Sequence, residues 1–223
     1  DGMSLALFDL DNTLLADDSD YLWGRFLVEQ GLVDGVFYER ENQKFYDSYR
    51  AGTLDIHAFL HFMLRPLTAH PLATLLAWRA QFIKEKIEPI ILPKAVALLD
   101  KHRKAGDTLL IITATNCFIT APIAERLGVQ HLLATEIEFS DGRYTGQPLG
   151  IPCFQQGKVT KLHDWLAATG HDLTDSWFYT DSRNDLPLLV EVAHPVAVDP
   201  DEILAQYATE RGWPIISLRE NKR

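Results

Sequence analysis

Two carboxylates near the start of the chain have a spacing that suits catalysis on an α/β sheet. Asp9 and Asp11 follow the short apolar run Leu5–Phe8. Residues two apart on a strand point the same way, so both carboxylates would share one face where the strand ends. At the carboxyl edge of an α/β sheet, such a pair can bind a metal, attack an electrophile or transfer a proton. A strand that ends in an ordinary Asp/Asn turn is the structural alternative.

Further polar side chains follow later parts of the chain, where strands end or helices begin. They are Thr113 and Ala114, Lys158, and Asp181, Asn184 and Asp185. In a doubly wound sheet the carboxyl ends of the strands meet at one crevice, so we expect these groups to lie near Asp9 and Asp11. Carboxylates hold Mg²⁺, while a hydroxyl and an ammonium neutralise phosphate oxygens. The combined set is what phosphoryl transfer requires.

The segment after the first carboxylates has a helical pattern. From about Ser19 to about Ile87, apolar residues recur at steps of three and four, and no strand pattern interrupts them. Leu72 to Ile87 repeats in this way as an amphipathic helix. Glycines and prolines divide the whole segment into about four helices. The dividing residues are Gly31, Gly35, Gly52, Pro66 and Pro71.

Helices and strands alternate in the remainder of the chain. Pro93 suits the first turn of a helix, and Asp141-Gly142 is a strong hairpin signal. The apolar runs expected to form strands are 109–112, 132–134, 177–179 and 196–198. Alternation of this kind implies a parallel sheet that is covered on both faces.

We therefore predict an α/β fold, a doubly wound parallel sheet with an inserted helical cap domain. The first strand must join strands far away in the sequence, so the core is discontinuous. Its predicted parts are residues 1–15 and 89–223, and the cap comprises residues 16–88.

Composition excludes several classes of protein. Hydrophobic residues make up 47% of the 223, which is enough for a substantial core. No apolar run approaches the ~20 residues of a membrane span, and no secretory signal is evident, so a cytoplasmic protein is expected. A formal charge of −10 argues against nonspecific binding to nucleic acid. Cys117 and Cys153, the two cysteines, have no metal-like or redox spacing.

On these motifs, the chain resembles the haloacid dehalogenase superfamily of phosphohydrolases. All of that superfamily's motifs have a match in order, from Phe8-Asp9-Leu10-Asp11-Asn12-Thr13 to Asp181–Asp185. A helical insert directly after the first motif is similar to the C1-type cap of subfamily IB, which includes phosphoserine phosphatase. The extended opening through Asp18-Ser19-Asp20 resembles a bacterial branch of hydrolases that are often described as histidinol-phosphatases.

The resemblance implies roles for the acidic residues. Asp9 would attack phosphorus and become an aspartyl-phosphate. Asp11 would protonate the leaving alkoxide and later take a proton from water. Asp9, the backbone carbonyl of Asp11, and Asp181 would bind Mg²⁺. Asp185 would lie behind them and orient a metal-bound water or the lysine.

It also implies how the substrate is held. Thr113, Ala114 and Lys158 would bind the phosphoryl group, and Asn184 would touch phosphate or substrate. Thr180 is a departure, because many relatives have glycine before the metal-binding aspartate. Asp18 lies nine positions after the nucleophile, where phosphoserine phosphatases have an acidic residue that contacts the substrate amine.

Several of these assignments have plain structural alternatives. Asp18 and Asp20 could be an N-cap pair for the first cap helix, and Lys161 could replace Lys158 as the phosphate ligand. His57 and His61 have the spacing of helical zinc ligands, but no adjoining glutamate or third ligand is evident. Cys117 lies close to Thr113 and is expected to be a small buried hydrophobe.

The expected activity is Mg²⁺-dependent hydrolysis of a small phosphorylated metabolite by a monomer or homodimer. Histidinol phosphate leads on resemblance, and phosphoserine follows. A phosphomutase on the same fold and a noncatalytic phospho-ligand binding module are alternatives. A dehalogenase is the least supported, since it has no use for the acid/base carboxylate of Asp11.

Overall fold

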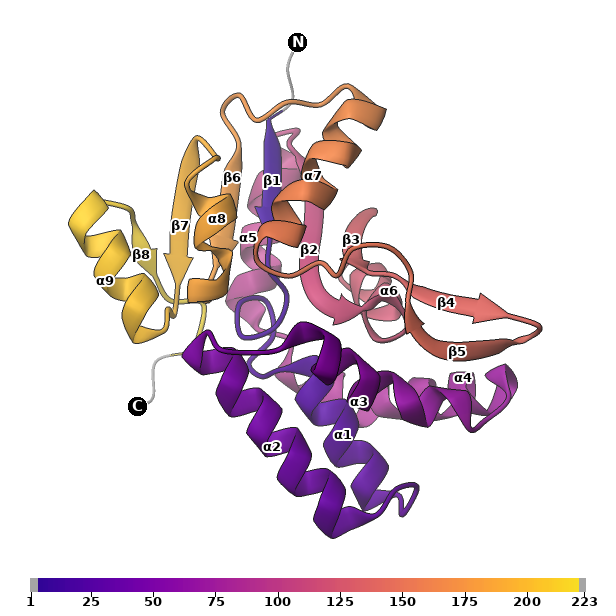
Figure 1. Cartoon of the computed structure of the whole chain (residues 1–223). Coiled ribbons are helices and arrows are strands. Elements are labelled where there is room, and N and C mark those ends of the chain that lie inside the picture. The colour runs from indigo at the N-terminus through magenta and orange to yellow at the C-terminus, as the bar shows by residue number, and fades with distance from the viewer. Residues whose placement is uncertain (1–3, 221–223) are drawn as a thin grey trace.

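A six-stranded parallel sheet forms the centre of the molecule in the computed structural model, which describes residues 4–220 (Figure 1). Its strands, in spatial order, are β3 (His131–Thr135), β2 (Thr108–Asn116), β1 (Leu5–Phe8), β6 (Trp177–Thr180), β7 (His194–Val198) and β8 (Ile215–Ile216). Every neighbouring pair in this order is parallel. The predicted doubly wound sheet is therefore confirmed.

Helices cover both faces of this sheet, and the sequence of β1 explains why. Ala6 and Phe8 belong to one hydrophobic cluster, whereas Leu5 and Leu7 belong to the other. All four are buried, as expected for a strand covered on both sides. The first cluster packs with α5 (Pro93–Lys104) and α6 (Cys117–Arg126), and the second with α7 (Gln156–Thr169), α8 (Leu186–Leu189) and α9 (Glu202–Arg211).

The direction of winding reverses between β1 and β6. The chain runs outward from β1 through β2 to β3, and then returns to β6 and runs outward through β7 to β8. Ligand sites of open α/β sheets lie at the carboxyl ends of the strands beside such a reversal. Asp9 and Asp181 directly follow these two strands, so the topology brings them together.

The helices of the insertion lie across this carboxyl edge (Figure 1). They are α1 (Ser19–Glu29), α2 (Gly35–Ala51), α3 (Ile56–Thr68) and α4 (Leu72–Phe82). A π-helical turn, Ile83–Ile87, and a 3₁₀ turn, Glu88–Ile90, lead back to the sheet. No helix among residues 4–220 has the length and apolar character needed to cross a membrane.

Two features of this segment differ from the sequence prediction. Pro66 lies inside α3 rather than between helices. Proline has no N–H to donate to the carbonyl of Phe62, and its ring crowds that carbonyl, so one bond of the preceding turn is lost and the helix ends two residues later at Thr68. The expected helix from Leu72 to Ile87 keeps its α-helical form only to Phe82, where the π-helical turn begins.

Two antiparallel segments connect the helices of the insertion to the sheet. Leu15 pairs with Ile91, the N–H of Ala16 donates to the carbonyl of Ile90 at 2.8 Å, and the N–H of Leu92 donates to the carbonyl of Leu14 at 3.2 Å. These contacts lie at the predicted domain boundaries. They support our proposal that residues 16–88 form a cap on a core made of residues up to 15 and from 89 onward.

A β-hairpin adds to the surface beside the cap helices. Strands β4 (Ile137–Ser140) and β5 (Arg143–Pro148) are joined by Asp141 and Gly142, with φ of 53° and 79°. Both residues are left-handed, as the predicted tight turn requires. Strand β5 packs against α3, so the hairpin and the cap helices contact each other although the sequence separates them.

Candidate active site

Asp9 occupies the centre of the site at the end of β1. Its side chain is buried, and its backbone N–H donates to the carbonyl of Tyr179 at 2.9 Å. This bond extends the pairing of β1 with β6 by a residue. The Asp9 carboxylate is thereby fixed at the reversal point of the sheet, within reach of Thr180 from β6 and Lys158 from α7.

Lys158 is the cation that faces Asp9. Its Nζ lies 3.2 Å from Asp9 Oδ1 and 2.9 Å from Asp185 Oδ1, and it donates to the carbonyl of Ile112 at 3.3 Å. Burial alone would lower the pKa of Lys158, but the charges of Asp185 and Asp9 outweigh it and raise the pKa. The ammonium therefore stays charged in a buried place, which is where it can neutralise a phosphoryl group.

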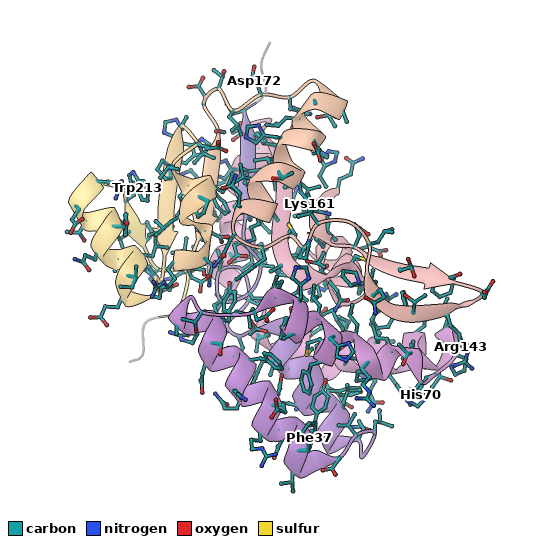
Figure 2. All side chains as sticks on the ribbon, viewed as in Figure 1. Phe37, His70, Arg143, Lys161, Asp172 and Trp213 are labelled. Atoms are coloured by element: carbon teal, nitrogen blue, oxygen red, sulfur yellow. The ribbon has the colours of Figure 1, made fainter. Side chains whose placement is uncertain are left out.

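The start of α7 determines the position of this lysine. A Cβ on Gly157 would lie only 2.1 Å from the carbonyl oxygen of Pro152, so only glycine fits the close approach there. Lys158 is the next residue, and it is buried. Lys161, labelled on α7 in Figure 2, makes no ion pair with any residue in the described range 4–220. The geometry thus favours Lys158 over Lys161.

Asp185 and Thr180 complete the buried network. The Thr180 hydroxyl lies 2.6 Å from Asp185 Oδ2 and 3.3 Å from Asp9 Oδ2, so the hydroxyl joins the two carboxylates. Burial raises the pKa of Asp185 to about 6, against the lowering effect of Lys158. At the position of Thr180, before Asp181, a glycine was expected from the family resemblance. The structure instead makes its hydroxyl part of the site.

Asp9 and Asp181 form a pair of neighbouring carboxylates. Thr13 donates to Asp181 Oδ1 at 3.0 Å and accepts from the backbone N–H of Asp181 at 3.1 Å. Burial and, next, the charge of Asp9 raise the pKa of Asp181 well above its usual value. Two carboxylates that repel each other in this way form a favourable place for a divalent cation.

The protein offers few oxygen ligands for Mg²⁺, but enough for the way this ion usually binds. Among residues 4–220, no group of three or more His, Cys, Asp or Glu side chains is arranged to hold a metal. The predicted set needs fewer side chains, because it consists of Asp9, Asp181 and the backbone carbonyl of Asp11. Mg²⁺ commonly takes one or two carboxylates and completes its shell with water and phosphate oxygens.

Asp11 stands on the side of the site that faces the cap. Its Oδ1 accepts from the backbone N–H of Ser19 at 2.7 Å, and its Oδ2 accepts from the Thr115 hydroxyl at 2.8 Å. Burial raises the pKa of Asp11, and these hydrogen bonds oppose the rise. Asn12, with φ of 56°, turns the chain after it. The carboxyl group thus lies between the sheet and the first helix of the cap.

The two candidate phosphate ligands on β2, Thr113 and Ala114, have different surroundings in the structure. Strand β2 continues to Asn116, with a register shift after Ile112, so Thr113 and Ala114 lie within the strand rather than after it. Thr113 is fully buried, and its hydroxyl accepts from the N–H of Thr115 at 3.2 Å. Ala114 and Thr115 line the cavity described below.

Asn184 is engaged by other parts of the protein. Its amide nitrogen donates to the carbonyl of Tyr49 at 2.8 Å, and its amide oxygen accepts from Gln155 at 2.9 Å. It does not line the cavity. The amide therefore connects α2 to the loop before α7, and its predicted contact with phosphate stays a prediction.

A cavity lies between the cap helices and the sheet. Acidic, aromatic and apolar side chains line it: Asp9, Asp11, Asp18, Asp20, Tyr21, Asn42, Phe45, Tyr46, Tyr49, Leu54, Ile56, Phe59, Ala114 and Thr115. This lining joins the two predicted catalytic carboxylates to cap residues from α1, α2 and α3.

Asp18 and Asp20 differ in how the protein uses them. Asp18 caps α1 by accepting from the N–H of Tyr21 at 2.8 Å, which is the structural role that the sequence also allowed. Asp20 is buried, and its Oδ1 has no hydrogen-bond partner in the described part of the chain. Burial and, next, the charge of Asp11 raise the pKa of Asp20 to about 8.

The remaining candidates have no part in this arrangement. His57 and His61 are exposed on α3, and no metal-binding group involves them within residues 4–220. Burial raises the pKa of the Cys117 thiol to about 11, which disfavours a reactive thiolate. Cys117 and Cys153 are both free.

Comparison with known proteins agrees with this geometry. A model of the haloacid dehalogenase-like hydrolase family matches residues 6–190. A histidinol-phosphatase of Neisseria meningitidis is 44% identical over 220 residues, which cover 97% of this chain and 99% of that protein. A phosphoserine phosphatase of Mycobacterium tuberculosis is 32% identical over 219 residues, covering 96% and 70%. The crystal structure of a Bordetella pertussis protein of unknown function has a TM-score of 0.92 at 44% identity, covering 98% and 100%.

Proposed function

This chain belongs to the haloacid dehalogenase-like hydrolase family, and we propose that it is a magnesium-dependent phosphomonoesterase that acts on a small phosphorylated metabolite. One observation carries the proposal. A buried carboxylate at the reversal point of the sheet, Asp9, faces a buried ammonium, Lys158, at 3.2 Å. Asp9 and Asp11 both line the cavity, and Lys158 reaches it through its contact with Asp9. A nucleophile, an acid and a phosphate-binding cation therefore converge.

The reaction would proceed in two displacements on Asp9. A carboxylate oxygen of Asp9 forms a bond to phosphorus while the bond from phosphorus to the ester oxygen breaks. Asp11 gives its proton to the leaving alkoxide. In the second step Asp11 takes a proton from water, whose oxygen bonds to phosphorus and releases Asp9. Dividing the hydrolysis in this way replaces one difficult step by two easier ones.

The surrounding groups neutralise charge and fix geometry. Mg²⁺, held by Asp9, Asp181 and the carbonyl of Asp11, would neutralise phosphate oxygens. Lys158 would also neutralise phosphate oxygens, and Asp185, which the Thr180 hydroxyl contacts, fixes the position of its ammonium. Thr113 is proposed to bind phosphate, although its hydroxyl now accepts from the N–H of Thr115.

We propose L-histidinol phosphate as the substrate, because a relative of nearly equal length with that activity in its name is 44% identical. O-phosphoserine is the second candidate, favoured by the relative that is 32% identical. We also propose a cytoplasmic location and a monomer or homodimer. The two free cysteines fit a reducing compartment.

The test is phosphate release from L-histidinol phosphate with and without metal. We expect turnover with Mg²⁺, a loss of at least about 100-fold after EDTA treatment, and recovery when Mg²⁺ is added back in excess. Turnover that is unchanged in EDTA would contradict the proposed metal. Transfer of the phosphoryl group without release of phosphate would instead indicate a phosphomutase.

A further inference from the structure

We propose that Asp20 is the receptor for a positive charge on the substrate. On this assignment the cavity selects phosphate esters whose alcohol carries an ammonium or imidazolium group and no carboxylate beside it. The inference rests on the proposed phosphatase function and deepens it. It also differs from the sequence expectation, which assigned contact with a substrate amine to Asp18.

One carboxylate oxygen of Asp20 is buried without a hydrogen-bond donor. Its side chain lines the cavity and is only 7% exposed, and Oδ1 has no partner among residues 4–220. The Thr115 hydroxyl is close by, but it has a single hydrogen, which it donates to Asp11 at 2.8 Å. A buried carboxylate without a donor is costly, so its presence at a cavity points to a partner that the ligand brings.

Asp18 is less suited to this role. Its Oδ1 accepts from the N–H of Tyr21 at 2.8 Å and so caps the first turn of α1. Its side chain is also more accessible than that of Asp20. Water can therefore satisfy its second oxygen. An ion pair with Asp20 would be better shielded from solvent and so would discriminate more strongly between charged and neutral ligands.

The walls of the cavity favour a cation in the same region. Aromatic side chains from the cap line it: Tyr21, Phe45, Tyr46, Tyr49 and Phe59. Aromatic faces attract ammonium and guanidinium groups, and the apolar bodies of the rings exclude water. A planar, positively charged ring such as imidazolium has both the charge and the shape for such a lining.

The same lining disfavours a carboxylate. Among the described side chains that line the cavity, none is Lys, Arg or His. Asp11, Asp18 and Asp20 all line it. Arg50, on α2, is exposed and donates to the Tyr46 hydroxyl at 3.4 Å. The α-carboxylate of phosphoserine would thus meet like charges, while histidinol phosphate has no carboxylate.

The experiment compares kcat/KM for three esters: L-histidinol phosphate, O-phospho-L-serine and para-nitrophenyl phosphate, which has no cation. Asp20→Asn keeps the size of the side chain and removes its charge. We expect it to reduce the ratio of histidinol phosphate to para-nitrophenyl phosphate by about 30-fold or more. Asp18→Asn retains the helix cap and should change that ratio by less than about threefold. Asp34→Asn, at the exposed cap of α2, is the matched control.

The melting temperature separates this role from a structural one. Since Asp20→Asn replaces a buried carboxyl that lacks a partner and is costly to ionise, its melting temperature should be unchanged or higher. A structural role would lower it and would reduce turnover of all esters alike. This inference alone would be overturned if Asp20→Asn left the ratio of histidinol phosphate to para-nitrophenyl phosphate unchanged, or if Asp18→Asn lowered that ratio instead. A preference of the original protein for phosphoserine would overturn it as well. If Mg²⁺ supports release of phosphate from none of the esters, the proposed function fails together with it.

Discussion

Replacing Asp9 by Asn should reduce phosphate release by at least about 1,000-fold while the protein stays folded. The amide has nearly the same size and can still accept from Lys158, which lies 3.2 Å from Asp9 Oδ1. It is, however, too weak a nucleophile to attack phosphorus. Loss of the charge also removes the repulsion that raises the pKa of Asp181, so no loss of stability is expected from that pair.

The measurement is steady-state turnover of L-histidinol phosphate together with a thermal melt. Asp17→Asn is the matched control. Asp17 is close in sequence and accepts from the N–H of Asp18 at 2.7 Å, but it does not line the cavity. If Asp9→Asn retained a tenth or more of the original kcat, the nucleophile would have to be another residue.

Replacing Lys158 by Met should lower both activity and stability. The variant leaves Asp9 and Asp185 buried without their shared cation, and removing one partner of a buried pair costs about 3–5 kcal/mol. Phosphate binding also loses its fixed positive charge, so kcat/KM should fall by at least about 100-fold. Urea denaturation and turnover measurements check the two effects separately.

Two further variants make this prediction specific. Lys158→Met combined with Asp185→Asn removes one of the two unpaired charges, so the double variant should recover much of the lost stability but none of the activity. Lys161→Met should resemble the original protein in both measurements. If Lys161→Met lost activity and Lys158→Met kept it, the assignment of the phosphate ligand would be reversed.

The sequence predicted those parts of the structure that depend on local pattern and topology. The apolar run before Asp9 indicated β1, and alternation of helices and strands indicated a parallel sheet. The position of Asp9 then follows, because the carboxyl ends of such strands share one edge. The hairpin at Asp141-Gly142 was likewise predictable, since its turn requires left-handed residues.

The sequence could not predict which partners the side chains would find. Thr180 acts on Asp9 and Asp185 through its hydroxyl, and Asn184 is held by Tyr49 and Gln155. These contacts join segments far apart in the chain. Residue spacing along the chain does not determine which of these side chains meet.

The same limit explains Asp18 and Asp20. Both are aspartates at the start of a helix, where either could act as an N-cap. The position of Asp18, nine residues after Asp9, favoured it as the contact for a substrate amine. Only the three-dimensional position of α1 shows that Asp18 is used as the cap and that Asp20 lies buried beside Thr115. A buried carboxylate that lacks a partner has no signature in sequence.

Chemical trapping during turnover tests the central claim most directly. Borohydride reduces an acyl phosphate to a primary alcohol as phosphate leaves, so phosphorylated aspartate becomes homoserine. We predict that mass spectrometry of enzyme quenched with borohydride during turnover of L-histidinol phosphate in Mg²⁺ finds homoserine at position 9, and that it is missing without substrate. Homoserine at another aspartate, or an unmodified Asp9 in enzyme that is turning over substrate, would contradict the account.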